Sequence, residues 1–119
     1  PSFQEAEFIY GLTALAAGDN ALSQKIFSDL GESKIIFDDR YISVLFGLKQ
    51  YQKIIDVAKR RVALQPSNLQ NYITLTAAYL QAGDMAQAVL TLQEIIKLDP
   101  TTKDKMEYYI NEIKAGRNP

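Results

Sequence analysis

Carboxylates are the side chains best suited to acid–base or metal chemistry in this chain, because histidine and cysteine are both absent. Imidazole is the commonest general base near neutral pH, and imidazole and thiolate are the usual zinc ligands. Asp38 and Asp39 form an acidic pair, but adjacent residues of a helix point about 100° apart and do not converge on one ion. We therefore assign this pair to the start of a helix, where negative charge is favourable.

No further motif supports catalysis. The sequence contains neither a Gly-rich phosphate loop nor a nucleophile elbow. A carboxylate-based enzyme, such as a glycosidase, stays open as the weakest alternative, since acids that converge in space need not be close in sequence. We expect a protein that is not an enzyme, with no catalytic residue, no metal and no cofactor.

The charge pattern does not favour nucleic acid or membrane as a partner. Thirteen Lys and Arg residues face 14 Asp and Glu residues, which gives a net charge of −1. The basic run Lys59-Arg60-Arg61 is expected to lie on a solvated helix face. The longest apolar stretch, residues 8–17, is far shorter than the roughly 20 residues of a membrane-spanning helix. We expect no nucleic acid and no membrane insertion; the compartment stays open.

The sequence contains an internal repeat that predicts a series of helical pairs. Pro66 and Pro100 are 34 residues apart, and Lys49 precedes Gly83 by the same 34 residues. The period predicts repeat units at about residues 4–33, 35–68 and 69–102, followed by a capping helix at residues 103–115. The first unit is about three residues short of the period, which predicts a shortened loop around residues 31–34.

The last unit shows how a pair is built. Apolar residues recur at three- and four-residue spacings in residues 72–80 and again in residues 89–96, which predicts two amphipathic helices. Between them, Gly83 can adopt the left-handed conformation that ends one helix, and Asp84 can cap the next. Ser67, with Gln70 three positions later, is expected to cap the helix that follows Pro66.

Residues 69–102 resemble the tetratricopeptide repeat (TPR) family. The landmarks that carry the resemblance are Tyr72, Leu75, Tyr79, Ala88, Leu92 and Pro100. The resemblance implies an all-α fold: one TPR domain over residues 1–119, a right-handed α-α superhelix of about seven antiparallel helices. It also implies a non-catalytic scaffold for protein–protein interaction.

In that family the first helix of each pair lines a concave groove that binds peptides. The resemblance places these partner-binding candidates in the groove: Phe8, Leu12, Leu15, Arg40, Ser43, Phe46, Gln70, Ile73, Thr74, Ala77, Leu80 and Gln81. Most are apolar, so the expected partner is a protein or peptide with an apolar or amphipathic segment, oriented by Arg40. The basic clamp by which some members bind carboxylate tails is missing, because Phe8, Leu12, Gln70 and Thr74 occupy its positions.

Two alternatives to a separate ligand stay open. Phe8, Leu12, Leu15 and Phe46 can instead pack between neighbouring helical pairs, or the groove can be filled by another part of a parent chain or by a second copy. The chain also loosely resembles tails of bacterial membrane proteins that assemble surface polysaccharide. A structural or assembly role within a larger polypeptide is therefore the second hypothesis, and self-association is compatible with it.

Overall fold

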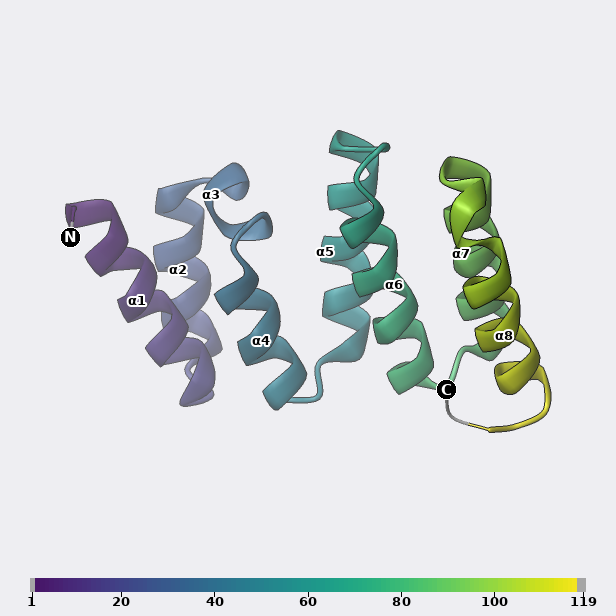
Figure 1. Cartoon of the computed structure of the whole chain (residues 1–119). Helices are drawn as coiled ribbons and strands as arrows, with labels where there is room; N and C mark the ends of the chain where they lie inside the picture. The colour runs from purple at the N-terminus through teal and green to yellow at the C-terminus, as the bar shows by residue number, and fades with distance from the viewer. Residues whose placement is uncertain (1, 118–119) are drawn as a thin grey trace. The chain divides into compact units, whose positions relative to one another are not determined.

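A computed structural model describes residues 2–117, and within this range the chain consists of eight α-helices and one 3-10 turn, with no β-strand (Figure 1). The helices form two compact units, an N-terminal unit of residues 1–50 and a C-terminal unit of residues 51–119. The predicted all-α fold of antiparallel helices is confirmed. The prediction of one domain over residues 1–119 stays a prediction.

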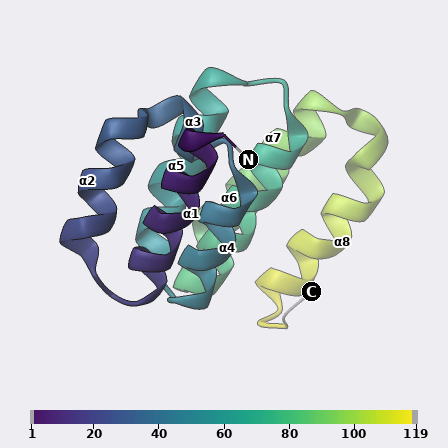
Figure 2. The ribbon, with the colours of Figure 1, turned by 90° about the vertical axis from the view of Figure 1, so that its left-hand side faces the viewer.

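The N-terminal unit contains α1 (Phe3–Ala16), α2 (Asn20–Leu30), α3 (Glu32–Ile36) and α4 (Asp39–Gly47). Helices α1 and α2 form an antiparallel pair, and α4 packs against α1. Seen in Figure 2, α2 and α4 lie on either side of α1. The short α3 contacts both α2 and α4 and so connects the pair to the following helix.

The C-terminal unit contains α5 (Tyr51–Leu64), α6 (Leu69–Ala82), α7 (Met85–Leu98), the 3-10 turn η1 (Pro100–Thr102) and α8 (Lys103–Lys114). Each helix packs against the next one in the chain. Helices α6 and α8 lie in front, with α5 and α7 behind them (Figure 1). This arrangement leaves α6 and α8 side by side over α7.

Four helices end in the same left-handed turn. The left-handed residues are Gly18, Lys49, Gly83 and Gly116, with φ of 83°, 59°, 81° and 78°. The following residue donates its backbone N–H to the carbonyl five residues earlier, as Asp84 does to Tyr79 at 2.9 Å, which is the Schellman motif. The Asp84 carboxylate then accepts from the Gln87 N–H at 3.2 Å, so both predicted roles at this turn are confirmed.

The connection predicted as a short loop differs from expectation. Residues 32–36 form α3, so the described chain has eight α-helices rather than about seven. Ile35 and Ile36 are only 5% and 7% exposed, and one helical turn buries both side chains while satisfying part of the backbone. The shortened period predicted that this connection is about three residues shorter than in the other units. It did not predict that residues 32–36 form a helix.

Two predictions were wrong in detail: the residue that caps α6 and the exposure of Arg61 on α5. Asn68 rather than Ser67 caps α6, since its side-chain oxygen accepts from the Gln70 N–H at 3.0 Å. Arg61 is only 3% exposed, whereas the rest of the basic run is solvated. Burial of Arg61 follows from its place on the face of α5 that packs against α6, where the buried Asn71 side chain donates to the Arg61 carbonyl at 3.3 Å.

We expect the close approach of α1 and α2 to depend on Gly11. A methyl group added there would lie 2.4 Å from Phe27 Cε1 and 3.1 Å from Ile26 Cγ2. Gly11→Ala should therefore lower the free energy of unfolding by about 1–3 kcal/mol through overpacking. The matched control is Gly47→Ala on α4, where nothing lies within 4 Å and better helix propensity should stabilise by about 0.5–1 kcal/mol. Urea denaturation of both variants measures the contrast; equal effects would contradict it.

We expect Lys49 to carry backbone strain. Its φ of 59° is costly for a residue with a Cβ, by about 1–2 kcal/mol, and glycine avoids that cost. Lys49→Gly should raise the free energy of unfolding by about 0.5–1 kcal/mol once the greater freedom of glycine in the unfolded chain is included. Lys49→Ala keeps the strain and should be nearly neutral. Thermal denaturation compares the two; a stabilisation shared by both variants would assign the effect to the lost side chain.

Candidate functional site

An apolar groove of about 390 Å³ lies in the C-terminal unit, with α6 and α8 as its walls and α7 as its floor. The α6 wall presents Ile73, Thr76, Ala77 and Leu80, and the α8 wall presents Lys105, Met106, Tyr109 and Ile113. Leu92 and Ile95 form the floor, and both are buried. The groove exists because α7 runs back between two helices whose facing sides are mostly apolar.

The groove carries little charge. Helix α6 contains no Asp, Glu, Lys or Arg, and Lys105 alone is charged among the described residues that line the groove. Among residues 2–117, Lys105 forms no ion pair, whereas the Nζ of the neighbouring Lys103 lies 3.9 Å from Glu107 Oε1. The hollow is thus an apolar surface with one ammonium group at its edge.

The structure brings three of the α6 candidates to this groove. Ile73, Ala77 and Leu80 line it, and Ile73 is 48% exposed. Gln70, Thr74 and Gln81 lie on the same helix but are not part of the lining. The Thr74 hydroxyl instead donates to the Gln70 carbonyl at 3.1 Å.

Sequence reasoning missed the α7 and α8 contributions. It treated residues 103–115 only as a cap, although Met106, Tyr109 and Ile113 form an apolar stripe at helical spacing. This helix was assigned only the role of covering the helical pair that precedes it. In the structure the same stripe both covers α7 and faces the groove.

The candidates of the N-terminal unit are mostly packed. Phe8 and Leu15 on α1 are 4% and 1% exposed, and Leu12 is half-buried. On α4, Phe46 is half-buried and Ser43 is exposed. The exposures of Phe8 and Leu15 fit the alternative in which these side chains pack among helices.

Arg40 is held within its own unit. Its guanidinium donates to Glu5 Oε1 at 2.6 Å and to Asp38 Oδ2 at 2.7 Å. It also lies 4.9 Å from the centre of the Phe8 ring, in cation–π distance. The donors expected to orient a ligand therefore already face two carboxylates.

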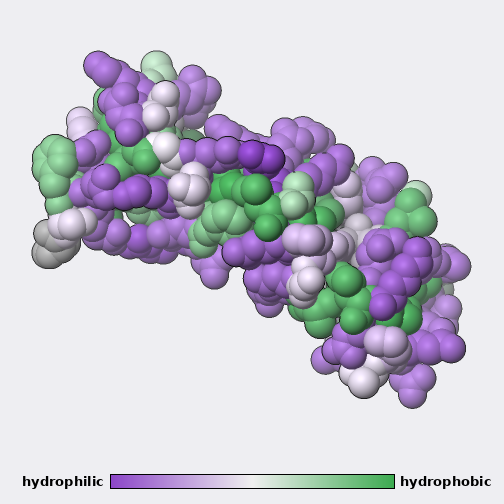
Figure 3. All heavy atoms as spheres, turned by 90° about the horizontal axis from the view of Figure 1, so that it is seen from above, coloured by the Kyte–Doolittle hydropathy of each residue, from purple (hydrophilic) through white to green (hydrophobic). Residues whose placement is uncertain are grey.

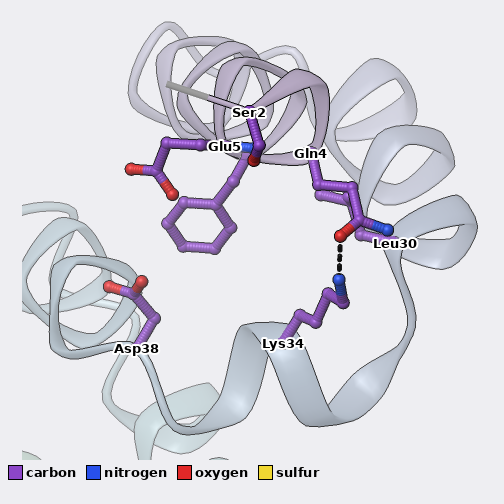
Figure 4. A pocket seen from close by; sticks show the side chains of 7 residues that line it. Ser2, Gln4, Glu5, Leu30, Lys34 and Asp38 are labelled. Carbon is purple, nitrogen blue, oxygen red and sulfur yellow. Dashed lines mark hydrogen bonds between the residues drawn. The ribbon is translucent and has the colours of Figure 1, made fainter.

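Glu5, Phe8 and Asp38 border a second, polar pocket of about 270 Å³ (Figure 4). Glu5 extends from α1 and Asp38 from the connection after α3, while Lys34 donates to the Gln4 side-chain oxygen. Hydrogen bonding to Arg40 lowers the pKa of Glu5, and hydrogen bonds to Asp38 and then to Glu5 raise the pKa of Arg40. A general acid needs the opposite shift, so the cluster is suited to joining α1 to α4 rather than to proton transfer.

The described residues contain neither a cluster of metal ligands nor a membrane-spanning helix. Among residues 2–117, no three His, Cys, Asp or Glu side chains are grouped so that they could hold a metal ion. Over the same residues, no helix combines the length and apolar character needed to span a bilayer. Hydrophobic residues do reach the surface at several places between hydrophilic ones (Figure 3).

The fold and the groove define an all-α protein of antiparallel helix pairs with an apolar hollow between helices. Residues 40–116, from the start of α4 to just beyond α8, match the family model of ChAPs, the Chs5p-Arf1p-binding proteins. The chain therefore belongs to the ChAPs family, a family of protein-binding proteins. No curated protein matches the chain.

This match corrects the family suggested by the sequence. The matching family is ChAPs and not the tetratricopeptide family. The physical reason is that the residues behind the resemblance perform generic helix packing: Leu75, Tyr79, Ala88 and Leu92 are all 7% exposed or less. Large and small apolar residues at these spacings are needed by any closely packed helical pair, so they do not identify one family.

We expect the Arg40–Glu5 pair to make stability depend on pH in the acid range. The pKa of Glu5 is lowered from 4.5 on folding, so the carboxylate stabilises the fold fully above about pH 4.5 and less as pH falls through the folded pKa. Glu5→Gln should lower the melting temperature at pH 7, and its difference from the wild type should shrink as the pH falls below 4.5 and through the folded pKa of Glu5. A difference that persists at low pH would show that the lost carboxylate is not the cause.

Proposed function

We propose that this chain is a non-catalytic scaffold that binds a segment of a partner protein in the groove between α6 and α8. The observation that carries the proposal is the apolar lining, with Ile73 48% exposed at its edge. All lining residues fall within the segment matched by the family model. Concave apolar surfaces of this kind are characteristic of binding sites.

The energetics favour a modest affinity. A groove of about 390 Å³ can accept two or three large side chains. Burying each contributes about 1.5–3 kcal/mol, while association costs at least about 4 kcal/mol. The proposed interaction is therefore in the micromolar range, as suits a reversible scaffold.

The family name indicates the kind of partner. ChAPs are described as proteins that bind Chs5p and Arf1p. We propose that this chain likewise binds a protein of one of these two kinds.

A structural role within a larger assembly is the second candidate, and α1 favours it. This helix exposes Phe3, Ile9 and Tyr10 at 80%, 47% and 57% on the surface of the N-terminal unit. Apolar residues clustered on one exposed helix are typical of a contact surface. In that role α1, rather than the groove, would make the main contact.

We expect Ile73→Asp to weaken binding of the chain to purified Chs5p or Arf1p at least about tenfold, because it removes an apolar contact and buries a charge in the interface. Isothermal titration calorimetry measures the affinity. Leu90→Asp is the matched control: Leu90 is similarly exposed, at 52%, but lies on α7 outside this groove, so its variant should bind normally.

Thermal denaturation should show both variants folded, because each replaces a side chain that is already about half exposed. Equal weakening by Ile73→Asp and Leu90→Asp would exclude the groove. Binding lost only on Phe3→Asp would favour the contact surface on α1.

A further inference from the structure

We infer, building on the function proposed above, that the groove recognises an amphipathic helix of the partner with an acidic side chain beside its apolar residues, and that Lys105 pairs with this carboxylate. The polarity of the lining, its dimensions and its single charge specify this occupant.

The lining favours a helix over an extended peptide. An extended segment would direct its backbone N–H and C=O groups at walls with few polar partners, and unpaired buried backbone groups are costly. Among the lining residues, the Thr76 hydroxyl already donates to the Tyr72 carbonyl at 2.8 Å. A helix pairs its own backbone and can present only apolar side chains to the groove.

The length of the groove fits a short helical segment. From Ile73 to Leu80 the α6 wall advances seven residues, or about 10.5 Å at 1.5 Å per residue. This distance is about two helical turns. An occupant with apolar residues at i, i+4 and i+7 would place them along the whole wall.

The charge of the groove fits an acidic residue at one end of that helix. Lys105 is the third residue of α8 and has no ion-pair partner among residues 2–117, whereas Lys103 faces Glu107. An ammonium group beside apolar walls is screened less than one in open solvent, so a carboxylate there is attracted more strongly. The nearby N-terminus of α8 adds partial positive charge at the same end.

Lys105 also determines the orientation of the occupant. The opposite end of the groove is formed by Leu80 and Ile113 and carries no charge. A helix inserted in reverse would leave its carboxylate beside these side chains, which is unfavourable. One cation therefore distinguishes the two directions in which an otherwise apolar helix could lie.

The test uses the full chain and an Ala-rich, N-capped helical peptide of about 15 residues with leucines at i, i+4 and i+7. One version carries Glu next to the first leucine, a second carries Lys at that position, and a third carries Glu but has a proline that breaks the helix. Fluorescence anisotropy measures binding of each peptide to the wild type, Lys105→Met, Lys105→Glu and Ile73→Asp. All variants replace exposed side chains, so circular dichroism should show unchanged helicity.

We expect the wild type to prefer the Glu peptide over the Lys peptide. Lys105→Met should weaken Glu-peptide binding about threefold and Lys105→Glu about tenfold, with Lys105→Glu gaining affinity for the Lys peptide. Ile73→Asp should lose both helical peptides, and the proline peptide should bind weakly. Rising salt should reduce the difference between the Glu and Lys peptides.

Equal binding of the Glu and Lys peptides, with both lost in Ile73→Asp, would overturn the role of Lys105 and leave the proposed function intact. Tight binding of the proline peptide would overturn the helical occupant. Failure of every peptide while Chs5p or Arf1p still binds through Ile73 would overturn this inference alone. Sedimentation that shows a wild-type dimer lost in Ile73→Asp would identify a second copy of the chain as the occupant.

Discussion

Tight chain reversal is the constraint on which the helical pairs depend. Where α6 turns into α7, only Gly83 and Asp84 separate the helices, so their facing residues must meet along their whole length. Such a reversal requires one left-handed residue, followed by a cap for the next helix. The pair then needs small residues where the backbones are closest, as fully buried Ala88 provides in α7.

The groove is a consequence of the same constraint applied twice. Because α7 reverses α6, and α8 reverses α7 after the η1 turn, α6 and α8 lie over one floor helix. The sides of α6 and α8 that border the groove would be ordinary solvated faces if both carried charged side chains. Instead, α6 has none, and α8 turns an apolar stripe toward it. The hollow is therefore defined by composition as much as by topology.

The sequence predicted most of the helices and the turn at Gly83, because helical periodicity and turn residues are local signals. It did not predict α3, since one turn of helix is too short to show a period. It also missed Lys105 as part of the site: only folding brings α8 beside α6. The tetratricopeptide assignment was wrong because Leu75, Tyr79 and Ala88 report close helix packing, a requirement shared by unrelated families.

The charge-free composition of α6 has a practical consequence. A wall without Asp, Glu, Lys or Arg side chains offers dissolved ions no charged group to screen. A response of the occupied groove to ionic strength would then originate mainly in charged groups of the guest and in the Lys105 ammonium opposite. The salt dependence of binding can therefore be assigned to the charges of the partner and to Lys105, because α6 contributes no charged side chain.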